Sequence, residues 1–247
     1  MWSLYDTLLD RIPEGITVTE TFMGDHWIGV HTDEDGAGLA MRINSTAIPR
    51  RKQGVYAGMT LKELAKAAKS WNFIEAGYGV AAINAYYNHR ERVKALGIDL
   101  THPSMANEAF QKYREEITGK KAAVIGHFSY LEHLLGPVCK LSILERRPRD
   151  GDYPDPACEY LLPEQDYVFI TGSTLVNKTL PRLLQLCGNA YTVLVGPSVP
   201  LAPALFDFGA DDLSGFVALT PADCFHAILS GIKGGHFKSG TMVNYRR

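Results

Sequence analysis

From Lys121 onward, short and continuously apolar runs alternate with stretches of helical pattern, and no other feature of the chain limits its fold as strongly. A run that is apolar at every position predicts a parallel strand, because helices cover both faces of such a sheet. The expected strands are residues 122–125, 139–144, 167–171, 191–195 and 215–219. The helices expected between them are residues 129–135, 180–186 and 222–229. The second half is therefore predicted to be a Rossmann-like α/β domain with a parallel sheet.

The first half has a different pattern, in which strands precede helices. Three strand-like runs, residues 16–23, 27–31 and 38–43, are separated by short Gly- and Asp-containing turns. This spacing predicts an antiparallel three-stranded meander. The first half is thus expected to be an α+β unit.

Capping patterns place the helices of the first half. Ser3 with Asp6, and Thr60 with Glu63, have the spacing of capping boxes, and Asn72 is a suitable N-cap. They predict one helix that ends before Pro13, one that runs to about residue 69, and a long one from residue 72 toward residue 96. Small residues recur every fourth position inside the long helix, which would let another backbone pack directly against it. A last helix is expected over residues 105–117, and the domain boundary after it separates residues 1–118 from 119–247.

Charge and sorting signals exclude several functional classes. Lys and Arg number 25 against 27 Asp and Glu, so the net charge of -2 gives no electrostatic reason to expect a nucleic acid partner. The N-terminus lacks the layout of a signal peptide, and no apolar run is long enough to cross a bilayer. We therefore expect a cytoplasmic protein without a membrane partner. Whether it acts alone or as a homodimer is left open.

The residues that follow the predicted parallel strands are the candidate binding residues, because ligands of open α/β sheets bind outside the carboxyl ends of the strands. These turns are rich in Gly and hydroxyl side chains, which lets backbone N–H groups approach a polar or anionic ligand. The alternative is that the hydroxyls only cap helices and the glycines only turn the chain. The candidates are Gly126, His127, Phe128, Glu145, Gly172, Ser173, Thr174, Gly196, Pro197 and Ser198.

Two amides extend this set of candidates. Asn177, with its neighbour Lys178, lies just before a predicted helix, where an anionic group would be well held. Asn84 is an amide inside an otherwise small and apolar helix, and a buried amide must find partners. Either Asn84 binds a neighbouring backbone group, or it faces a cleft between the two domains.

Known catalytic and metal-binding motifs are absent from these turns. A dinucleotide fingerprint from Gly126 would require glycines where Phe128 and Leu131 stand, and there is no P-loop or nucleophile elbow. The eight histidines and four cysteines have no spacing typical of a metal site, so no preformed protein metal site is predicted. Glu145 could contact a ligand or simply pair with Arg146 or Arg147.

The order of several motifs resembles the heavy-metal chelation domain family. The resemblance rests on residues 75–85, 171–179, 196–201 and 208–215 and extends over nearly the whole chain. It implies an N-terminal part similar to the enolase N-terminal domain, a Rossmann-like C-terminal part, and a cleft between them. By matching motif positions, it also implies that Asn84, Asn177 and the turns after the third and fourth strands line this cleft.

Two functions follow as hypotheses. In the first, the protein handles a metal ion that is carried by a small polar or anionic chelator, which would be its cofactor and its partner. In the second, it is an enzyme of unassigned class acting on a nucleotide-like or pterin-like molecule. His127 and Glu145 would then be the general acid or base, because both follow strands and histidine titrates near neutral pH.

Overall fold

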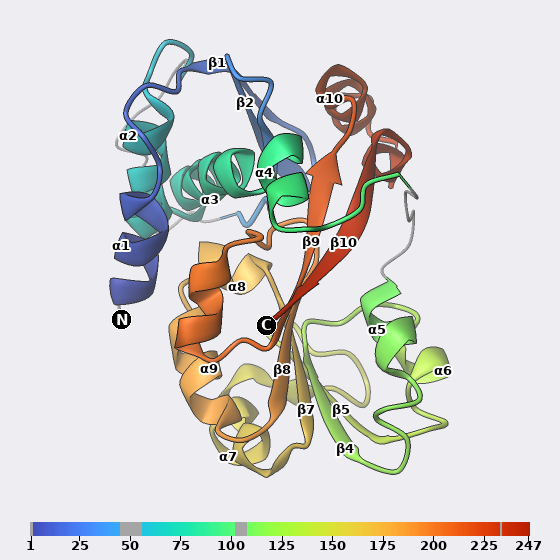
Figure 1. Cartoon of the computed structure of the whole chain (residues 1–247). Helices are drawn as coiled ribbons and strands as arrows, with labels where there is room; N and C mark the ends of the chain where they lie inside the picture. The colour runs from blue at the N-terminus through green and yellow to red at the C-terminus, as the bar shows by residue number, and fades with distance from the viewer. Residues whose placement is uncertain (1, 45–55, 102–107, 233) are drawn as a thin grey trace.

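The computed structural model describes residues 2–44, 56–101, 108–232 and 234–247, which form two α/β halves in contact with each other (Figure 1). The first half holds a three-stranded antiparallel sheet in the order β1-β2-β3. Its strands are β1 (Val18–Met23), β2 (Trp27–Thr32) and β3 (Ala37–Met41). Its helices are α1 (Ser3–Asp10), α2 (Leu61–Ala65) with its 3-10 extension η1 (Lys66–Lys69), α3 (Phe73–Tyr87) and α4 (Arg90–Ala95).

The second half is built on a seven-stranded sheet in the order β10-β9-β8-β7-β4-β5-β6. The strands are β4 (Lys121–Ile125), β5 (Lys140–Glu145), β6 (Tyr153–Pro154), β7 (Tyr167–Thr171), β8 (Tyr191–Val195), β9 (Asp212–Ala218) and β10 (Gly240–Arg246). Every neighbouring pair is parallel except β9 and β10, which are antiparallel. This confirms the predicted α/β class with a mostly parallel sheet.

Helices cover both faces of the seven-stranded sheet (Figure 1). Helices α7 (Cys158–Leu161), α8 (Ser173–Val176) and α9 (Leu180–Cys187) lie on one face. Helices α5 (Glu108–Tyr113) and α6 (Leu131–Leu134) lie on the other. The chain passes from β4 to β5 on one side and then returns to place β7 on the other side of β4. The strand order therefore reverses between β4 and β7, which is the switch point of the sheet.

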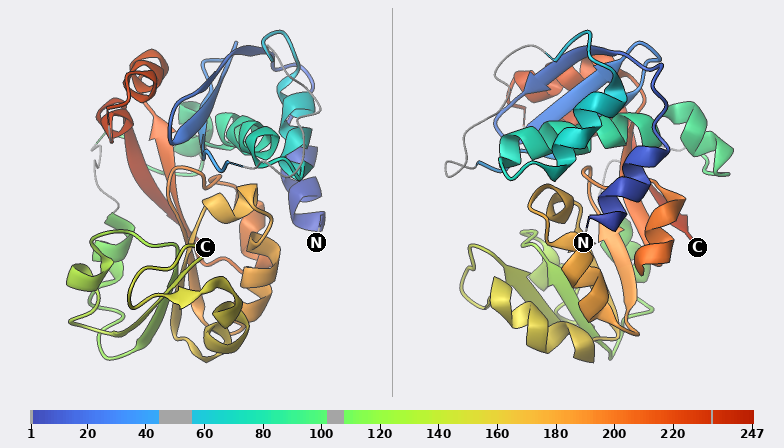
Figure 2. Two further views of the ribbon diagram at one scale, coloured as in Figure 1. Left: turned by 180° about the vertical axis from the view of Figure 1, so that it is seen from behind. Right: turned by 90° about the vertical axis from the view of Figure 1, so that its left-hand side faces the viewer.

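The two halves share elements rather than only a surface. Helix α10 (Pro221–Leu229) follows β9 in the chain but packs on the β1–β2 sheet, where the rings of Phe22 and Phe225 lie 4.2 Å apart. Figure 2 shows α10 beside the blue strands of the first half. One hydrophobic cluster contains buried residues of both halves, including Leu4, Ile83 and Leu205. The apolar core thus continues across the boundary between the halves.

The small residues of α3 allow its backbone to contact a strand and a neighbouring helix. A Cβ atom on Gly38 of β3 would lie 2.0 Å from the carbonyl oxygen of Ala81, and one on Gly79 would lie 1.9 Å from the backbone nitrogen of Ala68. A side chain at either glycine would therefore separate the elements. The close packing that the spacing of small residues predicts is present.

Several boundaries differ from the sequence-based prediction. The long helix expected from residue 72 to residue 96 is two helices, because α3 ends before Asn88 and α4 begins at Arg90 with His89 as its N-cap. The N-cap of α1 is Trp2 instead of Ser3, and no side-chain capping bond is present there among the described residues. Part of the helix expected over residues 105–117 lies outside the described residues. None of the helices in the described part of the chain has the length and apolarity that crossing a bilayer requires.

Candidate functional site

Three predicted binding turns follow neighbouring strands, because β4, β7 and β8 lie side by side. Gly126 follows β4 and Gly196 follows β8, with φ of 104° and 108°, which favour glycine. A Cβ atom on Gly126 would lie 3.2 Å from Cγ2 of Thr171, whereas one on Gly196 would have no atom within 4 Å. The backbone at Gly196 therefore borders open space at the carboxyl edge of the sheet.

Two residues that each carry a buried polar atom without a partner contact the turn at Gly196. The Gly196 N–H donates to the carbonyl of Ser214 on β9 at 2.9 Å, and the hydroxyl Oγ of Ser214 has no hydrogen-bond partner in the described part of the chain. On the other side, Nδ2 of Asn84 donates to the carbonyl oxygens of Leu39 at 2.7 Å and Pro197 at 3.4 Å. Its Oδ1 is buried and likewise without a partner among the described residues. Asn84 thus binds neighbouring backbone groups, which is the first of the two alternatives predicted for it, but it does so only through Nδ2.

The hydroxyl residues of the turns after β7 and β8 make contacts within the protein. Ser198 Oγ accepts a hydrogen bond from the Met41 N–H at 2.8 Å, which joins this turn to β3. Thr174 Oγ1 donates to the Thr171 carbonyl at 2.7 Å, and Ser173 Oγ lies 3.2 Å from Thr171 Oγ1. All three side chains are buried. The structure therefore brings these predicted residues together, and their ligand contacts stay a prediction.

Gly172 and Asn177 have local structural roles as well. A Cβ atom on Gly172 would lie 2.7 Å from the carbonyl carbon of Ser198, so only glycine lets the two turns pack together. The Asn177 side chain accepts hydrogen bonds through Oδ1 from the N–H and the hydroxyl of Thr179, at 3.1 and 2.6 Å. Asn177 thus orders the chain just before α9.

His127 and Glu145, the two acid–base candidates, meet at the ends of β4 and β5. Glu145 Oε2 accepts a hydrogen bond from the His127 N–H at 3.0 Å. The His127 ring lies between two further carboxylates, with Nδ1 2.9 Å from Asp152 Oδ1 and Nε2 3.3 Å from Glu132 Oε1. The side chains of His127 and Asp152 are only 5% and 2% exposed, so this pair is shielded from water.

Asp152 and Glu132 were not among the residues predicted from the sequence. Asp152 lies in a loop of mixed charge without periodicity, and Glu132 is an isolated acidic residue on the short helix α6. Only the fold brings them to the same imidazole. Phe128, also predicted, packs its ring 5.2 Å from that of Phe110 on α5 and so helps to hold this edge of the sheet.

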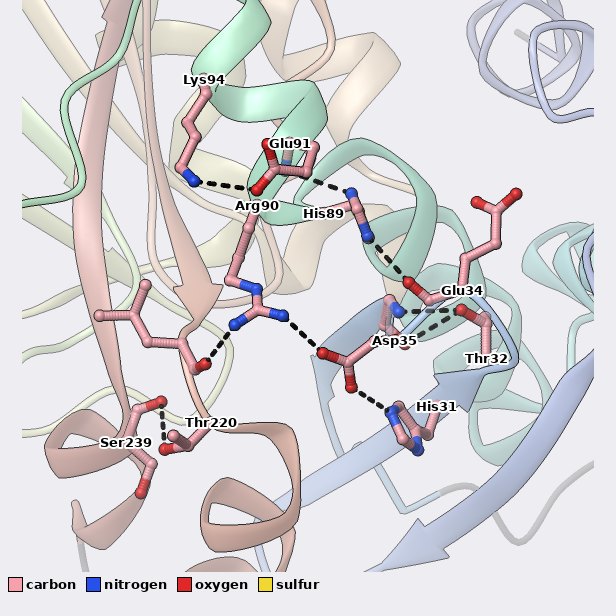
Figure 3. A network of polar contacts seen from close by, with 12 residues as sticks. His31, Thr32, Glu34, Asp35, His89, Arg90, Glu91, Lys94, Thr220 and Ser239 are labelled. Atoms are coloured by element: carbon pink, nitrogen blue, oxygen red, sulfur yellow. Dashed lines mark hydrogen bonds and ion pairs between the residues drawn. The ribbon is translucent and has the colours of Figure 1, made fainter.

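A second polar network joins the two halves away from the strand ends (Figure 3). Arg90, at the start of α4, donates from Nη2 to Asp35 Oδ2 at 2.6 Å and from Nη1 to the carbonyl of Leu219 at 2.9 Å. Asp35 also contacts His31 Nε2 at 3.1 Å, and His89 Nε2 contacts the Glu34 carbonyl at 3.0 Å. These groups link the β2–β3 turn, α4 and the end of β9. Their exposure and mutual pairing are typical of a structural connection.

Neither the histidines nor the cysteines form a metal centre in the described part of the chain, where no group of three or more His, Cys, Asp or Glu side chains is arranged to hold an ion. Cys158, Cys187 and Cys224 are buried free thiols. Burial raises the pKa of Cys187 to about 11 and those of Cys158 and Cys224 to about 12, which makes their thiolates scarce at neutral pH.

Comparisons with known proteins bear on both halves. Residues 108–247 match a family model described as "putative heavy-metal chelation", and residues 5–87 match a second model with the same description. An uncharacterized protein of Methanocaldococcus jannaschii is 37% identical over 153 residues, which cover 59% of this chain and 55% of that protein. The chain thus spans little more than half the length of this relative.

Solved structures match over the full length of the chain. A protein of unknown function from Desulfitobacterium hafniense, of the DUF364 family, is 42% identical, with a TM-score of 0.91 and coverage of 100% of this chain and 99% of that one. A protein of the same family from Pyrococcus horikoshii has 20% identity, a TM-score of 0.78 and coverage of 99% and 98%. The second likeness concerns the fold alone.

Proposed function

This chain belongs to the family described as "putative heavy-metal chelation", and we propose that it binds a metal ion carried by a small polar or anionic chelator. The proposed site is the carboxyl edge of the parallel sheet where it faces the first half, around the turn that begins at Gly196. In this proposal the chelator supplies most of the metal ligands, and the protein recognises the complex through backbone and neutral polar groups.

The observation that carries the proposal is a pair of buried polar atoms without partners, on residues next to the open space at Gly196. Ser214 Oγ and Asn84 Oδ1 are both buried and both lack a hydrogen-bond partner among the described residues. Buried polar groups are nearly always satisfied, so each such atom calls for an explanation, of which a bound molecule is one. Both residues contact the turn, through the Ser214 carbonyl and Asn84 Nδ2, and a molecule could approach Gly196 closely there. The switch point between β4 and β7, where this fold class binds ligands, is one strand away.

Replacement of Ser214 by Ala tests this proposal. Because Oγ has no partner among the described residues, the substitution should leave the melting temperature unchanged or slightly raised. The affinity for the complex should fall about tenfold, as for a lost hydrogen bond in a buried site. The measurement is calorimetric titration of purified protein with Ni²⁺–citrate, with Ni²⁺ alone and citrate alone as reference titrations.

Gly196→Ala, which fills the open space, supplies a second variant with a matched control. Gly209 has nearly the same φ, 103°, at the end of a 3-10 helix, so Gly209→Ala introduces similar backbone strain outside the proposed site. Binding should be lost in Gly196→Ala and kept in Gly209→Ala.

The proposal is wrong if the wild type shows neither a heat of binding nor a change in melting temperature with Ni²⁺–citrate, other divalent metal citrates and a cellular small-molecule extract. It is also wrong if all variants bind with equal affinity.

The second candidate function is an enzyme acting on a nucleotide-like or pterin-like molecule at the same edge. The buried His127–Asp152 pair favours it, because a carboxylate on Nδ1 orients an imidazole for proton transfer through Nε2. Screening such compounds should then detect turnover that His127→Gln abolishes. Turnover that survives both His127→Gln and Glu145→Ala would reject these residues as the acid and base.

A further inference from the structure

A small aromatic pocket lies away from the strand ends, between α1 and the start of α9. It has a volume of about 90 Å³ and is lined by Trp2, Tyr5, Trp71, Lys178 and Pro181. The Trp2 ring lies 5.5 Å from that of Tyr5 and 6.0 Å from that of Trp71, in edge-to-face arrangements. Tyr5 belongs to the buried core, whereas Trp2 and Trp71 are 38% and 56% exposed and so contribute little to the core packing.

The backbone of Lys178 is fixed in an unusual conformation. Its φ is 72°, in the left-handed region that residues other than glycine and asparagine rarely adopt, at a cost of about 1 kcal/mol or more. The side chain lies near two rings, with Nζ 5.9 Å from the Tyr5 centroid and 5.7 Å from the Phe73 centroid. Nζ donates a hydrogen bond to the Val176 carbonyl at 2.7 Å. The amine is thus positioned beside the rings by a strained backbone and one hydrogen bond.

The charged groups on the neighbouring elements are paired with other partners. On α1, Asp6 forms an ion pair with Lys69, and on α9, Arg182 binds Glu159 at 2.5 Å. Tyr5 faces the pocket with its ring, while its hydroxyl donates to the Leu175 carbonyl at 2.7 Å. Among the contacts of the described residues, no carboxylate contacts the Lys178 amine. Burial without a counter-charge lowers its pKa to about 7, so a large fraction of the amine is neutral at physiological pH.

We propose that Lys178 is the nucleophile of a carbonyl-binding site, where it forms a reversible imine with a small aldehyde whose apolar or aromatic group packs against Trp2 and Trp71. A desolvated lysine in an apolar pocket is the usual form of an imine-forming amine. The hydrogen bond to Val176 uses an N–H and leaves the lone pair of the neutral amine free to attack. This site is separate from the proposed chelate site.

The reaction balances without any co-reactant. The Lys178 lone pair forms a bond to the carbonyl carbon, and the carbonyl oxygen takes up a proton as the nitrogen loses one. Loss of water then gives the C=N bond, and addition of water reverses the sequence. The pocket has room for only part of one ring, because a cavity that holds a whole benzene molecule measures about 150 Å³. The expected substrates are therefore small aldehydes, including aryl aldehydes whose ring stays partly exposed.

Reductive trapping of the full chain tests this inference. The protein is treated at pH 7 with benzaldehyde and cyanoborohydride, and the benzylated fraction of each amine is measured by peptide mass spectrometry. Lys178 should react at least about tenfold faster than Lys66 and Lys94, whose ammonium groups pair with Glu63 and Glu91 on the surface. The α-amino group of Met1 is counted in its own peptide, because it also titrates near neutral pH.

The variant Trp71→Ala distinguishes recognition of the aldehyde by the aromatic pocket from a general reactivity of the Lys178 amine. Trp71 is exposed, so its removal should leave the fold intact. Trapping of benzaldehyde at Lys178 should fall several-fold in this variant, while trapping of formaldehyde, which has no group to fill the pocket, should be unchanged. The inference is overturned if Lys178 reacts no faster than Lys66 and Lys94 in the wild type. The aromatic part of the site is overturned if Trp71→Ala reduces the trapping of both aldehydes equally or of neither.

Discussion

His236 shows how one buried side chain can make the whole fold sensitive to pH. It is 3% exposed and lies among the rings of Trp27, Phe216 and Phe237, at centroid distances of 5.1, 5.6 and 4.2 Å. Its Nε2 has no hydrogen-bond partner in the described part of the chain. Burial lowers its pKa to about 4. The side chain of His127 is also buried, at 5% exposure, but carboxylates contact both of its ring nitrogens.

The low pKa of His236 predicts a loss of stability in mild acid. Between pH 6.5 and 4 the unfolded chain binds a proton at this histidine and the folded chain does not. The free energy of unfolding therefore decreases as the pH is lowered. From the cited pKa, the contribution reaches about 3 kcal/mol at pH 4. His236→Phe, which keeps a ring among the others, should remove that part of the pH dependence in urea unfolding from pH 7.5 to 4.5.

The difference in the free energy of unfolding between the wild type and His236→Phe reports on His236 alone, because the carboxylates titrate in both proteins. His133→Gln changes an exposed imidazole and should unfold with the pH dependence of the wild type. If the wild type and His236→Phe keep a constant stability difference over this pH range, then His236 is not held neutral by the fold.

Residue types alone indicated some roles correctly and left others undecided. Thr60 and Asn72 are N-caps as their spacing predicted, since a cap depends only on residues within one turn. The fit of Gly172 against Ser198 could not be predicted, because it depends on two turns that only the sheet brings together. The same holds for the meeting of His127 with Asp152.

At the scale of elements, the break between α3 and α4 is made by the side chain of Asn88. This side chain is 2% exposed, and its Nδ2 donates to the carbonyl oxygens of Val199 at 2.9 Å and Phe216 at 3.0 Å. Its Oδ1 accepts from the Leu201 N–H at 2.8 Å. The helix therefore ends at Asn88, whose side chain connects the first half to the second by these hydrogen bonds. No Gly or Pro stands between residues 80 and 96 to end a helix, and the sequence therefore predicted one helix up to Gly97.

Asn88→Ala should therefore be strongly destabilising. Three buried backbone groups would lose their partner, and each unsatisfied group costs about 1–3 kcal/mol, so a total loss of about 3 kcal/mol or more is expected. Urea unfolding followed by circular dichroism measures it. Asn189→Ala, at an exposed asparagine, is the matched control and should change stability by less than about 0.5 kcal/mol. A loss in Asn88→Ala no larger than in this control would show that the bridge contributes little.

Strand patterns predicted the centre of the sheet better than its edges. β7 and β8 have the predicted bounds, because strands covered on both faces are apolar at every position. Strand β10 was missed, since it lies at the edge, runs antiparallel to β9 and has polar residues such as Asn244. The two-residue strand β6, at the other edge, is too short to give any pattern.

At the scale of the molecule, the halves are joined by packing that neither half could complete alone. The core cluster that contains Leu4 and Ile83 also contains Leu175 and Leu205. Asn84, Asn88 and Ser198 add hydrogen bonds between α3 or β3 and the turn after β8. The candidate site lies at this junction. The fold of each half was predictable from local patterns, whereas the geometry of the junction, and hence of the site, follows from contacts between distant residues.

This shared core predicts that the halves unfold together, although they are predicted as separate domains. The three tryptophans, Trp2, Trp27 and Trp71, lie in the first half, and the four cysteines all lie in the second, from Cys139 to Cys224. Tryptophan fluorescence and pulsed thiol labelling therefore report on different halves of the same molecule. In a urea series the two signals should give one common midpoint.

Leu205→Ala, which creates a cavity in the shared core from the second half, should lower the free energy of unfolding by about 2–5 kcal/mol and move the midpoint of both signals equally. A fluorescence midpoint that stays in place while the thiol midpoint falls would mean that the first half is stable by itself, and the shared core would then not couple the two.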